Sequence, residues 1–174
     1  YIRYDVLYTY VLARVQYWSQ QAQQDGDKLL QRLLNASDKE RNTAKKKQTA
    51  ELKRATKRKA EVDNLFAKMY EDWSVGRITE YNFNMLSEKY QSEQRELDEK
   101  IQELQAELDA ATQTAVDAEK WIELMKKYVN PTQLTAELLN ALIEKILIHE
   151  AVKHEDGTRE QKVEIFYRFI GKVE

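Results

Sequence analysis

Apolar residues in the first part of the chain recur at alternating spacings of four and three. The stripe that runs from Tyr4 through Val15 to Ala22 lies on one face of an α-helix. Two further stripes follow a heptad pattern, one ending at Trp73 and the other beginning at Phe83 and continuing to Val129. Sustained heptads of this length are typical of coiled coils. The pattern therefore predicts a mainly α chain that contains two long helices.

A short polar segment separates the two heptad stripes. Gly76 suits the left-handed residue that ends a helix, and Thr79 suits the N-cap of the next one. Because so few residues join the helices, we expect them to fold back as an antiparallel coiled-coil hairpin. An arm of about 40 residues would be roughly 60 Å long. We assign the arm to residues 37–116, with its tip at 74–79, and residues 1–36 to an N-terminal base helix.

The remaining residues, 117–174, are expected to hold the end of the return helix, a short helix and a β-hairpin. Pro131 stops the return helix, and Thr135 can cap the short one. The pattern leaves two alternatives at the start of the arm. Residues 1–36 continue into it as one bent helix, or a new helix starts at Ser37 or Asp38. The predicted fold is a long hairpin projecting from a small α+β base.

The β-hairpin is predicted from alternating apolar positions on either side of Asp156-Gly157, a strong turn signal. A two-residue turn there would set Ile148 opposite Ile165 and Ile146 opposite Tyr167. The second strand would extend to Phe169. A two-stranded ribbon alone is marginal in water, so it should pack on the first and last helices or join strands from upstream.

Charge is distributed unevenly along the predicted arm. Residues 39–59 hold ten basic and two acidic residues, whereas residues 93–109 hold seven acidic and two basic ones. If the chain turns near Arg77, Lys53 faces Ile101 and Lys46 faces Leu108, so the two stretches lie side by side. The favoured interpretation is that these charges pair across the hairpin. The other is a stripe that contacts the DNA backbone.

Composition excludes several chemistries. The chain has no cysteine, and its two histidines, His149 and His154, are poorly placed as a metal pair. It has no nucleophile motif, no phosphate-binding glycine loop and no isolated carboxylate pair, so we expect neither catalysis, nor a metal, nor a cofactor. No apolar run approaches twenty residues, and we expect no membrane partner.

Two groups of residues are candidates for contacts. The arm tip concentrates bulky apolar groups, which we expect to contact protein, although they could instead only close the tip. The β-hairpin turn carries basic side chains that could contact DNA, although a solvated turn is favoured there. The tip candidates are Trp73, Val75, Ile78, Tyr81 and Phe83; the possible DNA contacts are Lys153, Arg159 and Lys162.

Three blocks of the sequence resemble the C-terminal region of large serine site-specific recombinases of the transposon and conjugative-element type. They are YIRYDVLYTYVLARVQ, LFAKMYEDWSVGRITEYNFNMLSEKYQSEQ, and LTAELLNALIEKILIHE followed by QKVEIFYRFIG. The blocks follow the same order and span nearly the whole chain, although none is a catalytic signature.

The resemblance implies a non-catalytic module in the bacterial cytoplasm. In such recombinases an N-terminal resolvase-like domain carries the nucleophilic serine, and a zinc ribbon and recombinase domain bind the attachment site. The coiled coils contact one another between DNA-bound subunits during synapsis. The sequence begins at Tyr1 rather than methionine, and we expect it to be a piece that starts just after the ribbon's zinc-binding cysteines. DNA, other copies of the coiled coil and a directionality factor are the implied partners.

One alternative remains. The chain could be a structural or nucleic-acid-binding coiled-coil arm of an unrelated protein, like the hairpin with which seryl-tRNA synthetases grip RNA. A base assembled from both sides of the arm favours the recombinase interpretation.

Overall fold

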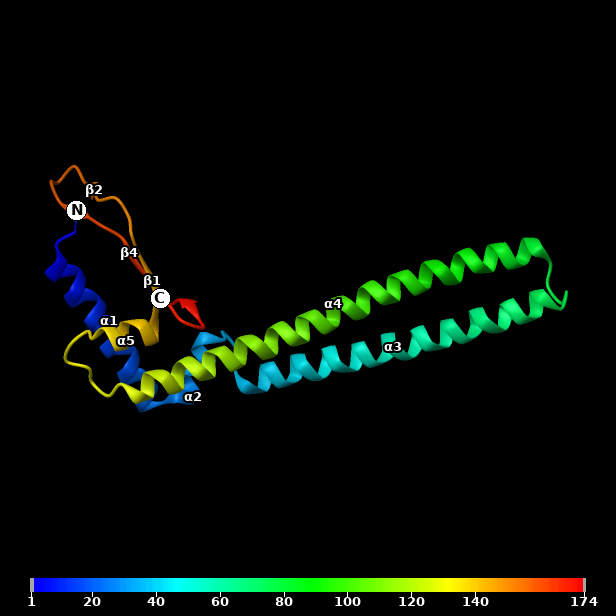
Figure 1. The fold of residues 1–174 in the computed structure, drawn as a ribbon, viewed down its shortest axis with the longest axis horizontal. Helices are drawn as coiled ribbons and strands as arrows, with labels where there is room; N and C mark the ends of the chain where they lie inside the picture. The colour runs from blue at the N-terminus through cyan, green and yellow to red at the C-terminus, as the bar shows by residue number, and fades with distance from the viewer. Residues whose placement is uncertain (1, 174) are drawn as a thin grey trace. The chain divides into compact units, whose positions relative to one another are not determined.

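The computed structural model describes residues 2–173, and over this range the fold is mainly α with short antiparallel strands after the helices (Figure 1). Asp38–Thr112 form one compact unit, and the segments before and after them form a second. The elements in chain order are α1 Tyr4–Gln24, α2 Gly26–Leu33, α3 Asp38–Ser74, α4 Glu80–Lys127, α5 Ala136–Leu142, β1 Ile143–Ile148, β2 Val152–Lys153, β3 Arg159–Glu160, β4 Val163–Tyr167 and β5 Gly171–Lys172.

The unit of residues 38–112 is the predicted helical hairpin. α3 and the first two-thirds of α4 run antiparallel and side by side (Figure 1). The seam between them buries Ala55, Val62 and Met69 of α3 and Leu104 of α4. These α3 residues are seven apart, as the heptad pattern predicts. Because only two helices meet, the seam is narrow, and most other side chains of the hairpin stay partly or fully exposed.

The second unit is built around α1. Its buried face contains Val11, Val15, Trp18 and Ala22, which confirms the predicted stripe from Val11 onward, whereas Tyr4 at the start of the stripe is exposed. Trp18 meets Trp121 of α4 edge to face, with ring centroids 5.8 Å apart. The other buried apolar residues of this core are Leu29, Ile122, Met125, Leu138, Leu142, Ile143, Ile165 and Tyr167.

Polar contacts fix α1 against the segment that follows α4. Ser19 donates to the carbonyl of Tyr128, and the Gln16 side chain donates to the carbonyl of Pro131 at 2.8 Å. These carbonyls belong to the residues where α4 ends and helical partners are no longer available. Two α1 side chains therefore supply donors to carbonyls that lie beyond the last turn of α4.

Between α1 and α3 the chain breaks twice, so residues 1–36 do not continue into the hairpin as one helix. Asp25 accepts a hydrogen bond from the Lys28 backbone N–H at 3.0 Å and caps α2. Asn35 has a φ of 51°, a left-handed conformation that asparagine tolerates better than most residues and that ends α2. α3 then begins at Asp38, one of the two starts left open by the sequence.

The short helix and its cap were predicted correctly. The Thr135 side chain accepts from the Leu138 backbone N–H at 3.1 Å, and α5 follows directly. The apolar spacing of Leu138, Leu139 and Leu142 would extend this helix to Ile143, but Ile143 is instead the first residue of β1. The segment thus passes from helix to strand without an intervening loop.

The predicted register of the β-hairpin is wrong by two residues. Ile146 pairs with Ile165, and Ile148 pairs with Val163. The turn is a three-residue loop of residues 155–157, because the His154 backbone N–H donates to the Thr158 carbonyl. Gly157 in this loop takes a φ of 86°. This longer loop shifts the strand register by one residue. A second one-residue shift occurs between the β2–β3 pair and the β1–β4 pair. Since the total shift is even, the apolar side chains keep the predicted faces.

The sheet also differs from the expectation at its other edge. Instead of strands from upstream, the two-residue strand β5 pairs with β4 and completes the order β1-β4-β5. Phe169 lies outside β4, in the turn before β5, with a φ of 72° and a half-exposed ring. The chain reverses at this point because Gly171, with a φ of 68°, also takes a left-handed conformation.

Candidate functional site

The tip of the hairpin is closed by a helix C-cap followed at once by a helix N-cap. The Gly76 N–H bonds to the Trp73 carbonyl at 2.9 Å, and the Arg77 N–H bonds to the Asp72 carbonyl at 2.8 Å. With Gly76 at a φ of 76°, this is a Schellman motif. Thr79 then accepts from the Asn82 N–H at 3.3 Å. Both caps were predicted from the sequence, and they give the tip a defined backbone.

Aromatic rings pack across the tip. Trp73 stacks on Phe83 with ring centroids 4.6 Å apart, and Tyr70 lies 5.9 Å from Trp73 and 6.4 Å from Phe83. This cluster joins the last turn of α3 to the first turn of α4. Trp73 and Phe83 therefore close the tip, which is the structural role left open for them.

The other candidates at the tip remain accessible. Tyr81 is 76 % exposed and Val75 is 66 % exposed, whereas Ile78 is partly buried. Tyr70 and Met85, which the sequence reading did not single out, are also more than half exposed. Tyr70 lies one helical turn before Trp73, so helical periodicity could have found it. The accessible tip surface, as we define it, consists of Tyr70, Val75, Tyr81 and Met85.

The basic and acidic stretches of the hairpin lie alongside each other, as predicted. Arg58 donates to both carboxylate oxygens of Glu93, at 2.6 and 3.2 Å, and Lys59 pairs with Asp98. The hydrogen bond from Arg58 lowers the pKa of Glu93, and the hydrogen bond that Lys59 donates to Asp98 raises the pKa of Lys59. Another cross-hairpin pair joins Lys100 to Glu51 at 2.7 Å. These pairs are partly exposed to solvent and help to set the register more than they stabilise the hairpin.

Part of the basic stretch takes no part in this pairing. Lys46, Lys53 and Lys57 are spaced by seven and four residues, so they share one face of α3, opposite the buried Ala55 and Val62. All three are exposed, and none forms an ion pair within residues 2–173. The stretch therefore has a paired edge beside the seam and an unpaired outer face.

The candidate DNA-contact residues lie at two different places in the structure. Lys153 and Arg159 are paired neighbours on the short ribbon of β2 and β3, and both are exposed. The carboxylates of Glu155, Asp156 and Glu160 lie on the same ribbon or its turn, so its charge is mixed. Lys162 belongs to a different cluster at the start of β4.

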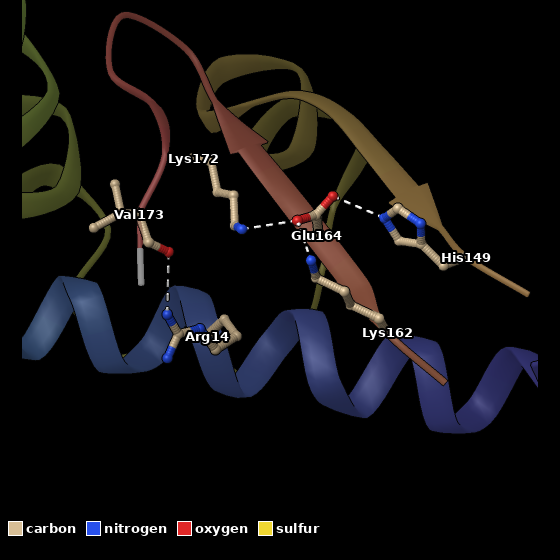
Figure 2. Close-up of polar contacts among 6 residues, drawn as sticks. All are labelled: Arg14, His149, Lys162, Glu164, Lys172 and Val173. Atoms are coloured by element: carbon tan, nitrogen blue, oxygen red, sulfur yellow. Dashed lines mark hydrogen bonds and ion pairs between the residues drawn. The ribbon is translucent and has the colours of Figure 1, made fainter. Parts of the chain in front are cut away.

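That cluster is centred on Glu164 (Figure 2). The Glu164 carboxylate accepts from Lys172 at 2.7 Å, from His149 at 2.8 Å and from Lys162 at 3.0 Å. These bonds connect β4 to β5 and to the residue after β1. Together the hydrogen bonds from Lys172, His149 and Lys162 lower the pKa of Glu164 to about 2. This cluster could not be predicted from the amino-acid pattern, because its members come together only through strand pairing.

We expect Glu164→Gln to weaken the acid sensitivity of the fold. The pKa of Glu164 lies near 4.5 before folding and about 2 after it, so the ionised carboxylate stabilises the fold above pH 4.5. That contribution is lost as the pH falls from 4.5 through about 2. The melting temperature of the unsubstituted chain should therefore fall more steeply over this interval than that of the variant. Glu160→Gln, at a well-exposed carboxylate, is the control; equal slopes for Glu164→Gln and the unsubstituted chain would contradict the assignment.

Within residues 2–173 no group of three or more His, Cys, Asp and Glu side chains is arranged to hold a metal ion. In the same range, no helix is both long enough and apolar enough to cross a membrane.

Comparison with known proteins gives a match over the C-terminal part of the chain. Residues 107–174 match a family model described as a domain of unknown function, DUF4368. The matched segment comprises the end of α4, α5 and all of the strands. No curated protein and no solved structure matches the chain.

Proposed function

We propose that this chain is a non-catalytic module of a DNA site-specific recombinase of the large serine type. In this proposal the helical hairpin mediates contacts between DNA-bound subunits, and the unit built around α1 assists binding to the attachment site. The observation that carries the proposal is the accessible tip surface: Tyr70, Val75, Tyr81 and Met85 expose apolar side chains on a backbone fixed by two caps. The resemblance of the three sequence blocks supplies the class of protein.

The packing of the tip indicates that the exposed side chains contribute to contact with a partner more than to the stability of the fold. The Trp73–Phe83 stack already closes the tip, so the fold gains little from Tyr81, Val75 or Met85. Exposed apolar side chains that cluster at one place are typical of protein-contact surfaces. Tyrosine is also favoured at such surfaces, because it offers a large contact area at a low entropic cost.

Substituting the accessible tip residues should impair synapsis without affecting the fold. We expect Val75→Ser with Tyr81→Ser, in the complete recombinase, to lower synaptic-complex formation about tenfold or more, because buried tyrosine anchors contribute about 1–2 kcal/mol or more each. Single-site DNA binding and helicity should be unchanged. Gel-shift assays on one-site and paired-site DNA, with circular dichroism, measure the three quantities.

The matched control is Tyr4→Ser, at a tyrosine that is 79 % exposed in the other unit. Normal synapsis in the tip double variant, with normal helicity, would refute the proposed contact. Reduced synapsis in both variants would show a general effect of lost surface tyrosine, which also contradicts it.

The outer face of α3 favours a second candidate, a nucleic-acid-binding arm. Lys46, Lys53 and Lys57 make a row of unpaired positive charge about 17 Å long. Such a row would bind phosphates without sequence preference, and its affinity would fall steeply with salt. The two candidates differ in which change matters: replacing these lysines with glutamine would abolish binding by an arm of this kind and would leave tip-mediated synapsis intact.

A further inference from the structure

A pocket of about 320 Å³ lies between α1 and the strands β4 and β5. Its polar lining consists of Tyr10 and Arg14 from α1, and Lys162, Glu164, Tyr167 and Lys172 from the strand segments. Figure 2 shows Arg14 on α1 and the two lysines beside Glu164 on the strand side. All of these residues belong to one compact unit.

Arg14 is held in place without a carboxylate partner. Its guanidinium lies 5.3 Å from the Trp18 ring and 5.6 Å from the Tyr17 ring, so aromatic faces support it. Its hydrogen bond to the Val173 carbonyl is long, at 3.5 Å, and no carboxylate among the described residues pairs with it. A guanidinium has five N–H donors, so most of the donor capacity of Arg14 remains available.

Tyr167 adds a second unsatisfied group to the pocket. The residue is only 1 % exposed, and its hydroxyl has no hydrogen-bond partner among the described residues. Burial raises its pKa to about 12, so the hydroxyl stays protonated at neutral pH and can donate. Arg14 and the indole of Trp18 both lie close enough to the hydroxyl to favour its ionised form, although neither meets the full geometry of a hydrogen bond. Buried hydroxyls are normally hydrogen-bonded, and one beside a half-buried arginine indicates a place for an acceptor.

The charges favour an anion. Arg14, Lys162 and Lys172 contribute three positive charges against the single carboxylate of Glu164, which leaves an excess of two. Glu164 bonds to both lysines and thereby fixes their ammonium groups at the edge of the pocket. A tetrahedral dianion with several acceptor oxygens can accept from a guanidinium, an ammonium and a hydroxyl at once.

We propose that this pocket binds a phosphate group, with Arg14 as its principal ligand, Lys162 and Lys172 as neutralising cations and the Tyr167 hydroxyl as an additional donor. Glu164 orients the lysines but opposes the anion, so it limits the affinity. The phosphate comes either from a nucleic-acid backbone or from a free phosphate compound. The pocket does not depend on the proposed role of the hairpin tip.

Calorimetric titration of the chain with inorganic phosphate, against chloride at matched ionic strength, tests the site. We expect saturable binding that Arg14→Gln weakens about tenfold or more, as loss of a charge-assisted hydrogen bond does. Tyr167→Phe, which keeps the buried ring, should weaken it a few-fold. Glu164→Gln should strengthen it, because the opposing charge is removed. Arg3→Gln, at an exposed arginine paired with Asp5, should change nothing.

Glu164→Gln separates a phosphate site from a purely structural cluster. A structural cluster would lose stability in this variant without any gain in phosphate affinity. Because Arg14→Gln could disturb the Trp18 stack, Lys162→Gln, at a well-exposed side chain, provides a second test with the melting temperature as a check on folding. Absence of phosphate binding above the chloride control, or equal affinity in Arg14→Gln, Lys162→Gln and the unsubstituted chain, overturns the proposal.

A short DNA duplex distinguishes the two sources. If the duplex displaces inorganic phosphate, and Arg14→Gln weakens both, the natural ligand is a backbone phosphate. If phosphate binds to the pocket and the duplex does not compete, the ligand is a free phosphate compound. Either result is compatible with normal or impaired synapsis in the tip variants, so failure of one proposal is not failure of the other.

Discussion

Trp121→Ala is expected to destabilise the unit built around α1 by about 3–5 kcal/mol. Trp121 is fully buried, and its ring meets Trp18 at 5.8 Å and Tyr167 at 5.5 Å. Removing it deletes the central member of three edge-to-face rings that join α4, α1 and β4. Because the stability of a whole domain is only about 5–15 kcal/mol, we expect this unit to be largely unfolded at 37 °C.

Urea denaturation followed by near-ultraviolet circular dichroism measures this loss. Trp121→Phe should cost much less, because the indole N–H makes no hydrogen bond within the described residues and a phenyl ring keeps most of the apolar contact. Trp73→Ala, at a partly exposed tryptophan in the hairpin, is the matched control and should leave the aromatic signal of the other unit unchanged. A loss below about 1 kcal/mol in Trp121→Ala would contradict the proposed packing.

Val62→Asp should separate the two helices of the hairpin. Val62 is fully buried in a seam with few other buried residues, so an ionised carboxylate there would lose its hydration and separate the apolar side chains of the two helices. We expect a loss of about 3 kcal/mol or more, seen as lower helicity and easier urea unfolding. The loss should shrink at low pH, because protonation removes the buried charge.

Asn64→Asp is the control for that change. Asn64 is exposed and lies two residues further along α3, so it introduces the same charge on the solvent side of the helix. It should alter stability by less than about 0.5 kcal/mol. Equal helicity in the two variants would mean that α3 and α4 do not pack through Val62.

Features that depend on a few neighbouring residues could be predicted from the sequence. Gly76, Thr79 and Thr135 each act within one helical turn, and each has the predicted capping role. The heptad seam through Ala55 and Val62 was likewise predictable, since its period sets which face is buried. The mainly α fold with a coiled-coil hairpin and a C-terminal β-hairpin follows from these local signals.

The errors concern pairing over longer distances. The Asp156-Gly157 turn signal was real, but whether the loop has two or three residues depends on the pairing of His154 with Thr158. β5 is only two residues long, too short to show a period. Without β5 the sequence could not place Lys172 beside Glu164, and Lys162 remained a candidate DNA contact with no known neighbour.

The position of the hairpin tip was predicted, but the packing of its side chains was not. Apolar residues near a turn were evident, whereas the division into closing and accessible side chains required the ring geometry of Trp73, Phe83 and Tyr70. Similarly, ten basic residues on one helix did not show which of them would meet acids across the seam. That depends on side-chain reach and rotation about the helix axis, which a one-dimensional pattern does not contain.

The core that contains Trp18 and Trp121 is assembled from segments separated by the whole hairpin. During synthesis α1 is therefore complete roughly a hundred residues before its partner leaves the ribosome, a delay of about 5–20 s at ordinary elongation rates. The hairpin needs only the tip turn to form and can fold first, which closes an otherwise long loop and brings the two halves of the core together. In the interval the apolar face of α1 is without its partner, so we expect this helix to be exposed to water or to a chaperone until α4 is complete.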